Sequence, residues 1–197
     1  MSASLEPLVL GALTGAVAER RPRRVLDIGC GAGLELAAMV EAAPGAEGVG
    51  IDIDANAARL AGRTLAGRGL ADRAQVLHTD VREAARHASG AFAEPFDFAL
   101  LANVLYYLPM SERVPLLRAV ARLLSPGGVL FVVTTIAEPR FFSRHFDLLL
   151  RAQEGQMELS TADELARQLT EAGLRPERPH ALAPGAPVVT LSATTSR

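Results

Sequence analysis

The chain has 197 residues, of which 49% are hydrophobic and 21% charged, and its formal net charge is −2. These values suit one globular domain around a sizeable core and exclude a chain that is disordered throughout. All 20 basic residues are arginine, which excludes phosphate-loop and Schiff-base lysines, and their scattered distribution offers no stripe for nucleic acid.

The first predicted element is a helix within residues 1–22, packed on the domain. Its apolar run is interrupted by Glu6 and Pro7 and follows no basic segment, so it resembles neither a signal peptide nor a membrane span. Cys30 is the single cysteine, which excludes an internal disulfide and a cysteine-based zinc cluster. We therefore expect a cytoplasmic protein with no membrane contact and no metal site.

Short apolar runs then alternate with helical stretches. Strands are predicted at 24–28, 48–52, 74–78, 96–102 and 129–135, and helices at 34–43, 55–68 and 111–124, with Ser111 as an N-cap. This alternation favours an α/β fold in which helices cover both faces of a mostly parallel sheet. We expect one domain over residues 1–197.

The end of the chain is less regular. Residues 138–155 are predicted to be helical or irregular, and Ser160 or Thr161 can cap a helix that Gly173 ends. Residues 174–195 form two extended stretches around Pro184 and Gly185, which predict a terminal antiparallel hairpin.

A glycine-rich turn follows the first predicted strand and leads into a helix. It contains Asp27, Gly29, Cys30, Gly31 and Gly33. Glycines permit a tight turn and let a ligand reach the backbone, and the helix start offers free N–H groups. Such strand-to-helix turns are typical of nucleotide sites.

The residue types in this turn distinguish two classes of nucleotide. A dinucleotide fingerprint requires a small residue where Leu34 stands, so the match fails. The Asp27 carboxylate would also repel a pyrophosphate, at a cost on the order of a kcal/mol. S-adenosylmethionine (SAM) has no phosphate and carries a sulfonium and an ammonium group, which a nearby carboxylate suits.

A second acidic segment, Gly50 to Asp54, ends the next predicted strand. A carboxylate at this position can accept hydrogen bonds from both ribose hydroxyls, and Asp52 stands directly at the strand end. Ile53 could then lie against the adenine face. Asp54 could instead cap the following helix.

The third predicted strand ends in His78, Thr79, Asp80 and Val81. The Asp80 carboxylate could accept a hydrogen bond from the adenine amine while Val81 packs against the ring. The alternative role for Asp80 is to cap the helix that starts at Arg82.

These segments together resemble the class I SAM-dependent methyltransferase family. The resemblance runs from about Arg24 to Thr135, and more weakly to the end, through VLDIGCGAG, VGIDID, LHTDV, FDFALLANVLYYLP and LLSPGGVLFVV. It implies a doubly wound, Rossmann-like sheet of seven strands whose last strand is antiparallel. It also implies SAM at the carboxyl ends of the strands, with Asn103 near the methionine moiety.

The resemblance also bears on the acceptor side of the site. The stretch HFDLLLRAQEGQMELSTADELARQLTEAGL is similar to small-molecule O-methyltransferases of the plant and polyketide-tailoring type, in which a histidine base follows an Asn-x-Leu element. Here Tyr106 stands at that position, and a tyrosine is a poor base at pH 7. Tyr106 and Tyr107 could pack on an aromatic substrate or simply fill space, and His145 is the remaining candidate base.

We therefore expect methyl transfer from SAM to a small molecule at O, N or C in secondary metabolism, with S-adenosylhomocysteine as product. A peptide or protein acceptor and a non-catalytic binding module are the alternatives. An NAD-dependent reductase is disfavoured by Leu34 and Asp27. About 23 residues precede the first strand, so a substrate pocket must use the first helix, the segment after the fifth strand, or a partner in a homodimer.

Overall fold

The computed structural model describes residues 5–139, 141–152 and 157–196. Parts of the first predicted helix and of the predicted irregular segment, namely residues 1–4, 140 and 153–155, lie outside the described residues.

Eight strands in the described ranges form one sheet in the order β3-β2-β1-β4-β5-β8-β6, and β7 pairs with β8. Strands β1 to β5 are parallel, and β8 is antiparallel to β5. The predicted mostly parallel sheet with an antiparallel last strand is therefore confirmed, as is the terminal hairpin. The described sheet has eight strands instead of the predicted seven, and the two-residue β7 pairs with β8 beside the main order. The strands are β1 (Arg24–Ile28), β2 (Glu47–Asp52), β3 (Ala74–His78), β4 (Phe96–Ala102), β5 (Leu124–Thr135), β6 (Leu174–Pro176), β7 (His180–Ala181) and β8 (Val188–Thr195).

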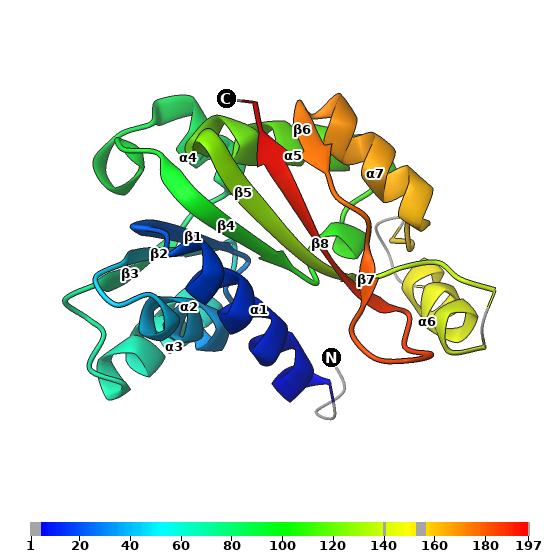
Figure 1. Cartoon of the computed structure of the whole chain (residues 1–197), viewed down its shortest axis with the longest axis horizontal. Coiled ribbons are helices and arrows are strands. Elements are labelled where there is room, and N and C mark those ends of the chain that lie inside the picture. The colour runs from blue at the N-terminus through cyan, green and yellow to red at the C-terminus, as the bar shows by residue number, and fades with distance from the viewer. Residues whose placement is uncertain (1–4, 140, 153–156, 197) are drawn as a thin grey trace.

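Helices cover both faces of this sheet, as Figure 1 shows. One face packs against α1 (Glu6–Arg20), α2 (Leu34–Ala42) and α3 (Ala55–Gly67), and α1 contributes the buried Val9, Leu13 and Val17. The other face packs against α4 (Val81–His87), α5 (Met110–Leu123) and α7 (Ala162–Glu171). Two single turns, η1 (Gly90–Phe92) and η2 (Leu105–Tyr107), flank β4. Alternating side chains of each buried strand thus supply two cores.

Two predicted boundaries are wrong, and both lie near proline. Helix α5 begins at Met110 after the extended Pro109, so Ser111 lies within the first turn and is not the N-cap. Strand β5 begins at Leu124, five residues earlier than predicted, because it resumes pairing with β4 across an irregularity at Phe96. By contrast, Thr161 caps α7 with a complete capping box to Glu164, which confirms one of the two predicted caps.

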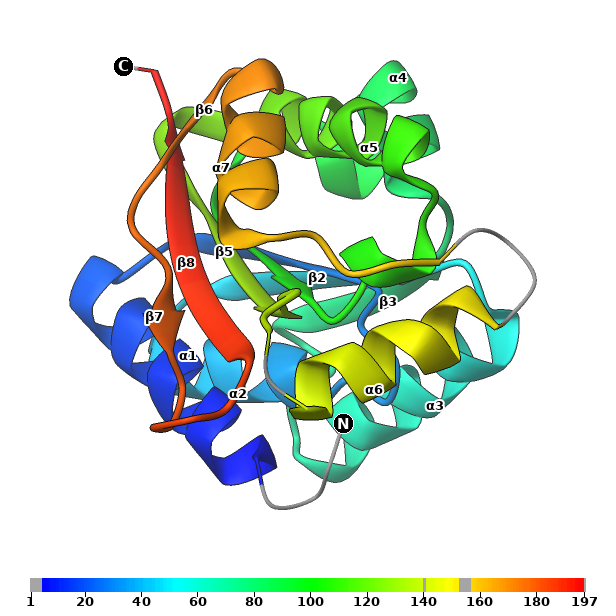
Figure 2. The ribbon, with the colours of Figure 1, turned by 90° about the vertical axis from the view of Figure 1, so that its right-hand side faces the viewer.

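Helix α6 (Phe141–Arg151) lies near the carboxyl ends of the central strands, on the other side from α5 and α7 in Figure 2. Its inner side carries Phe146 and Leu150, which pack with Tyr106 and Leu159 in a third, smaller core. The Asp147 carboxylate accepts a hydrogen bond from the Leu159 backbone at 2.8 Å. These contacts hold α6 beside the strand ends.

A buried arginine joins the same region to α5. Arg113 is 0% exposed and donates to the Leu108 carbonyl at 3.0 Å, the Ser160 hydroxyl at 2.6 Å and the Glu158 carbonyl at 2.6 Å. Burial lowers its pKa, while the charges of Glu158 and Glu164 oppose that shift. Since all three nitrogens have acceptors, the buried cation is satisfied and links η2 to the segment before α7.

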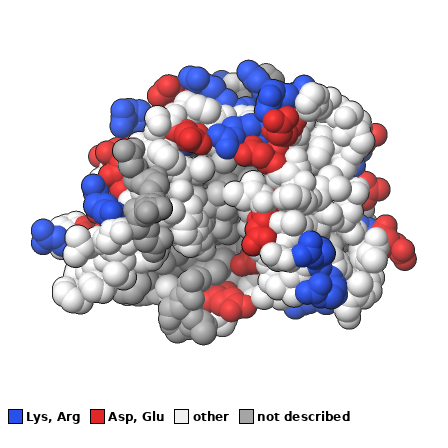
Figure 3. Space-filling model, turned by 180° about the vertical axis from the view of Figure 1, so that it is seen from behind, with Lys and Arg blue, Asp and Glu red and all other residues white. Residues whose placement is uncertain are grey.

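Acidic and basic side chains are interspersed on the face that Figure 3 shows, with no continuous basic stripe there. The expectation of scattered arginines is wrong at one place, because four arginines occur between Arg20 and Arg24. Arg24 donates to Glu47 at 3.1 Å and to the Ala91 carbonyl at 2.8 Å, and its guanidinium lies 4.9 Å from the centre of the Phe96 ring. Arg24 is therefore neutralised locally.

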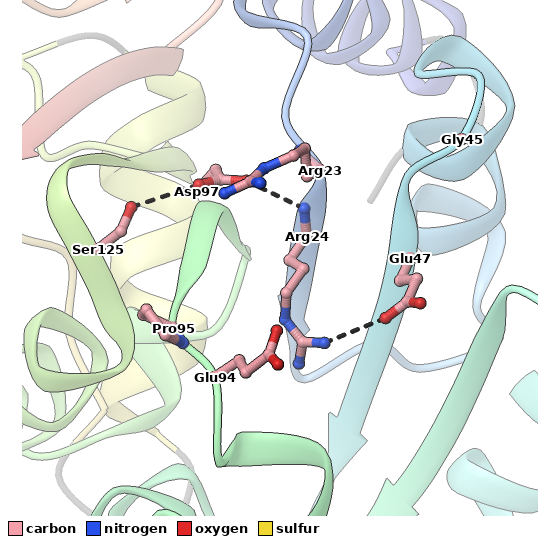
Figure 4. A pocket seen from close by; sticks show the side chains of 8 residues that line it. All are labelled: Arg23, Arg24, Gly45, Glu47, Glu94, Pro95, Asp97 and Ser125. Carbon is pink, nitrogen blue, oxygen red and sulfur yellow. Dashed lines mark hydrogen bonds and ion pairs between the residues drawn. The ribbon is translucent and has the colours of Figure 1, made fainter.

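A hollow of about 440 Å³ lies beside these arginines, at the amino ends of β1 and β4 (Figure 4). Asp97 accepts hydrogen bonds there from the backbone N–H groups of Arg23 at 2.8 Å and Arg24 at 3.1 Å, and from the Ser125 hydroxyl at 3.4 Å. Ligands of open α/β sheets bind at the opposite, carboxyl ends. We therefore interpret Asp97 as a link between β1, β4 and β5, rather than as part of a binding site.

Replacement of Asp97 by alanine leaves two backbone N–H groups unpaired and should lower the free energy of unfolding by about 1 to 3 kcal/mol. Urea denaturation measures the change. Glu94→Ala is the matched control, because Glu94 lines the same hollow and has no hydrogen bond or ion pair within the described chain. Equal stability of the two variants would contradict the structural role of Asp97.

Candidate active site

Three glycines of the turn between β1 and α2, Gly29, Gly31 and Gly33, have positive φ angles, and they differ in what surrounds them. A Cβ at Gly29 would lie 2.7 Å from Val104 Cγ2, and one at Gly33 would lie 2.9 Å from the Ala61 Cβ. Gly31, with φ of 51°, would meet nothing within 4 Å. Gly29 and Gly33 thus permit close packing and Gly31 leaves open space, so the backbone near Gly31 is the part a ligand can approach.

Asp52 ties this turn to the end of β2. One carboxylate oxygen accepts the Gly31 backbone N–H at 2.9 Å, and the other accepts the Asp54 N–H at 2.9 Å. Asp54 in turn caps α3 by accepting the Asn56 N–H at 2.7 Å, which confirms the alternative role considered for it. Each Asp52 oxygen keeps a further acceptor position.

Asp27 is the most buried acid of the turn, with 2% of its surface exposed. Its Oδ2 atom is buried without a hydrogen-bond partner. Burial raises its pKa most, and the negative charges of Glu35 and Asp52 add to the rise, while a hydrogen bond from the Leu36 backbone lowers it. A cation placed near this carboxyl would relieve the unfavourable burial.

Cys30 lies inside the same turn and is 3% exposed. Burial raises the pKa of its thiol to about 12, and the charges of Asp27 and Asp52 contribute to the rise. The thiol is therefore protonated at neutral pH, which excludes a thiolate nucleophile here.

A mainly apolar slot of about 100 Å³ opens beside the turn. Five of the predicted cofactor residues line it together: Gly29, Asp52, Ile53, Asp80 and Val81. The Ile53 side chain is 76% exposed. Sequence reasoning missed the other lining residues, which are Ile28, Ile51, Thr79, Arg82, Val104, Leu108 and Leu116.

Asp80 stands at the rim of this slot and has two roles in the fold. It caps α4 by accepting the Arg82 backbone N–H at 2.7 Å, which confirms the alternative role considered for it. It also binds the Arg82 guanidinium, with Oδ2 at 2.7 Å from Nη2. The hydrogen bonds from Arg82 hold the pKa of Asp80 below its usual value, against a smaller effect of burial.

Asn103 and Tyr106 follow the carboxyl end of β4. Asn103 adopts a positive φ of 57° and donates its backbone N–H to the Val133 carbonyl at 2.8 Å. Tyr106 is 5% exposed and packs edge-on against Phe146, with ring centres 5.5 Å apart. Burial raises the pKa of Tyr106, as do the charge and hydrogen bond of Tyr107. Tyr107 is 53% exposed.

The structure does not bring His145 into the slot. Its ring stacks on Phe141 at 5.9 Å on the exposed side of α6, and it lines a separate hollow of about 410 Å³ with Pro139, Arg144 and Leu148. Among the other histidines, His78 lies 3.0 Å from the Ile53 carbonyl near the slot.

Residues 6–178 match a family model described as a methyltransferase domain. The chain belongs to the class I SAM-dependent methyltransferases. Because the match spans most of the chain, it covers the glycine-rich turn, the acids that follow β2 and β3, and α6.

Relatives of known name support this placement. The ubiquinone biosynthesis O-methyltransferase of Bordetella avium (strain 197N) is 29% identical over 180 residues, covering 88% of this chain and 70% of that protein. The aclacinomycin 10-hydroxylase RdmB of Streptomyces purpurascens is 34% identical over 161 residues, covering 77% of this chain and 40% of that one. This second relative is named for a different reaction.

A solved structure shares the architecture. The mitomycin 7-O-methyltransferase MmcR superposes with a TM-score of 0.78 at 28% identity, over 95% of this chain and 54% of MmcR. The chain therefore spans about half the length of that protein.

Three observations show that the residues of this methyltransferase site fit SAM. The open backbone at Gly31 can admit a ligand, the unpartnered Asp27 oxygen suits a cation, and the apolar slot suits a purine ring. Within the described ranges there is no cluster of three or more potential metal ligands. In those same ranges, every helix is too short or too polar to cross a bilayer.

The raised pKa of Asp27 makes stability depend on pH. The folded state holds the proton of the Asp27 carboxyl more tightly than the unfolded chain does. The free energy of unfolding should therefore fall as the pH rises from the usual aspartate pKa through the pKa of Asp27 in the folded state. Each unit of pKa difference contributes about 1.4 kcal/mol. Asp27→Asn should lack this part of the slope in urea denaturation between pH 4 and 8.

The control is Asp72→Asn, which changes an exposed aspartate at the amino end of β3 and should keep the slope of the unmodified protein. If Asp27→Asn and the unmodified protein have the same slope, the burial cost at Asp27 is disproved.

Proposed function

We propose that this chain transfers the methyl group of SAM to a small-molecule acceptor. The observation that carries the proposal is the buried Asp27 carboxyl, whose Oδ2 atom has no hydrogen-bond partner, behind a glycine-rich turn that contains no phosphate-binding lysine. A carboxyl in this position attracts a cationic cofactor and repels a phosphorylated one. The names of the Bordetella relative and of MmcR, both O-methyltransferases, agree with it.

We assign the adenosine half of SAM to the slot. Asp52, with acceptor positions left on both oxygens, would receive the ribose hydroxyls. Ile53 and Val81 would contact the adenine ring, and the Asp80 carboxylate would accept a hydrogen bond from the adenine amine. When bound, SAM supplies a methyl group on a cationic sulfur.

The methionine half would lie against the glycine-rich turn and the end of β4. Gly29, Cys30, Gly31 and Gly33 shape the backbone there, Asp27 would attract the ammonium group, and Asn103 would border the reacting end. Orienting the acceptor for in-line attack contributes several kcal/mol to such a reaction without a strong base.

Tyr106 and His145 are our catalytic candidates on the acceptor side. Because its pKa is raised, Tyr106 is protonated at neutral pH, so it can donate a hydrogen bond to the acceptor but cannot remove its proton. His145 can act as a base only if a movement of α6, or the way the acceptor binds, brings the imidazole ring to the acceptor's proton.

The names of the Bordetella relative and of MmcR favour oxygen as the attacked atom over nitrogen or carbon. The name of MmcR also favours secondary metabolism as the setting. A second candidate is a member of the family that binds SAM without transferring its methyl group, and the 34% identity to a protein named a hydroxylase favours it. A peptide acceptor is a further alternative. Formation of S-adenosylhomocysteine from SAM and phenolic acceptors distinguishes transfer from binding alone.

Several properties of the whole protein belong to the same proposal. We propose that residues 1–197 act as one domain in the cytoplasm and do not bind nucleic acid. Arginines and acids are interspersed on the face in Figure 3, and Arg24 of the arginine cluster pairs with Glu47. A homodimer is the assembly we would test first, because it would supply additional walls for the acceptor.

Asp52→Ala should weaken binding of S-adenosylhomocysteine about 100-fold, because the ribose hydroxyls lose an ionised acceptor and the Gly31 N–H loses its partner. Isothermal titration calorimetry measures this. The control Asp54→Ser keeps a capping side chain on α3 and should bind within about threefold of the unmodified protein. Unchanged affinity in a folded Asp52→Ala protein would remove the ribose assignment.

His145→Gln tests the base. If His145 removes a proton from the acceptor, the variant should lose the acidic limb of the pH–rate profile and about 100-fold in kcat, since general bases contribute about 10² to 10⁴. Tyr106→Phe should lose about tenfold in kcat and keep its pH profile. A His145→Gln protein with an unaltered profile would exclude this histidine as the base.

A further inference from the structure

Arg82 forms a clamp on Asp80 at the rim of the slot. Its Nε lies 3.0 Å from Asp80 Oδ1 and its Nη2 lies 2.7 Å from Oδ2, so the guanidinium engages both oxygens. Its third nitrogen, Nη1, lies 2.9 Å from Glu112 Oε2 in the first turn of α5. Arg82 itself lines the slot.

The clamp leaves Asp80 with one defined open acceptor position. Three N–H groups of Arg82 meet the carboxylate: the backbone N–H binds Oδ1 at 2.7 Å, Nη2 binds Oδ2 at 2.7 Å, and the single Nε–H lies 3.0 Å from Oδ1 and 3.2 Å from Oδ2. A carboxylate has about four acceptor positions, two on each oxygen. Since the cap and the planar guanidinium fix the carboxylate plane, the free position on Oδ2 has a set direction.

We propose that Arg82 is a positioning residue for base selection, which holds Asp80 so that its free oxygen position accepts the exocyclic amine of adenine. Glu112 anchors the guanidinium from the opposite side. Arg82 itself is neutralised by two carboxylates, so it does not attract a phosphate to the slot. This inference rests on the proposed SAM site.

A purely structural role predicts something different. If Arg82 only joins α4 to α5 through Glu112, its loss should weaken all ligands of the slot equally, because the slot as a whole becomes looser. A positioning role instead changes the preference between bases. The ratio of two affinities therefore distinguishes the roles.

The test compares S-adenosylhomocysteine with S-inosylhomocysteine, in which a carbonyl oxygen replaces the amine and would face the Asp80 carboxylate. Calorimetry gives both affinities for the unmodified protein, Arg82→Met and Arg82→Lys. Arg86→Met is the matched control, because Arg86 lies one turn further along α4 and pairs with Glu83, away from the slot.

The unmodified protein and Arg86→Met should prefer the adenine ligand by about 100-fold, as expected for a site built to receive a hydrogen-bond donor. Arg82→Met should reduce this ratio about tenfold, and Arg82→Lys, which keeps the charge without the planar fork, should lie between. An unchanged or increased ratio in Arg82→Met would overturn the inference, even if both affinities fall.

The outcomes for the unmodified protein separate this inference from the proposed function. If it binds neither ligand, the proposed SAM site itself fails. If it binds both equally well, the site stands but base selection by Asp80, and with it the role of Arg82, is overturned.

Discussion

The hydrogen bond from the Gly31 N–H to Asp52 joins the turn after β1 to the tip of β2, and the arrangement of the site depends on it. The turn can adopt its path because Gly29 and Gly33 have positive φ angles and allow Val104 and Ala61 to approach closely. The same carboxylate orients the start of α3 through the Asp54 N–H. One side chain therefore sets the relation between the turn, the strand end and the next helix.

This arrangement has an electrostatic consequence. Burial raises the pKa of Asp27, and the negative charge of nearby Asp52 adds to the rise. Such a pair is unfavourable by itself and becomes favourable beside a cation. The methyltransferase family uses a cofactor with two positive centres and no phosphate, so the local instability of the turn is consistent with binding that cofactor.

The sequence was sufficient to predict elements that depend on local patterns. Alternating apolar runs placed β1 to β4 within a residue of their observed bounds, and the spacing of Asp52 and Asp54 indicated an acid at the strand end and a cap on α3. Contacts between distant residues could not be predicted in this way. Arg82 meets Glu112 across 30 positions, and the three acceptors of Arg113 come from loops whose paths depend on packing. The exposure of His145 likewise follows from the rotation of α6, which Phe146 and Leu150 determine by packing on Tyr106.

A crystal structure of the protein with S-adenosylhomocysteine tests the central claim most directly. In that structure, the ribose hydroxyls should lie on the Asp52 carboxylate, adenine should lie in the slot between Ile53 and Val81, and the ammonium group should lie on the Asp27 side of the glycine-rich turn. A ligand bound elsewhere, or one whose ammonium group points away from Asp27, would contradict this placement of the cofactor.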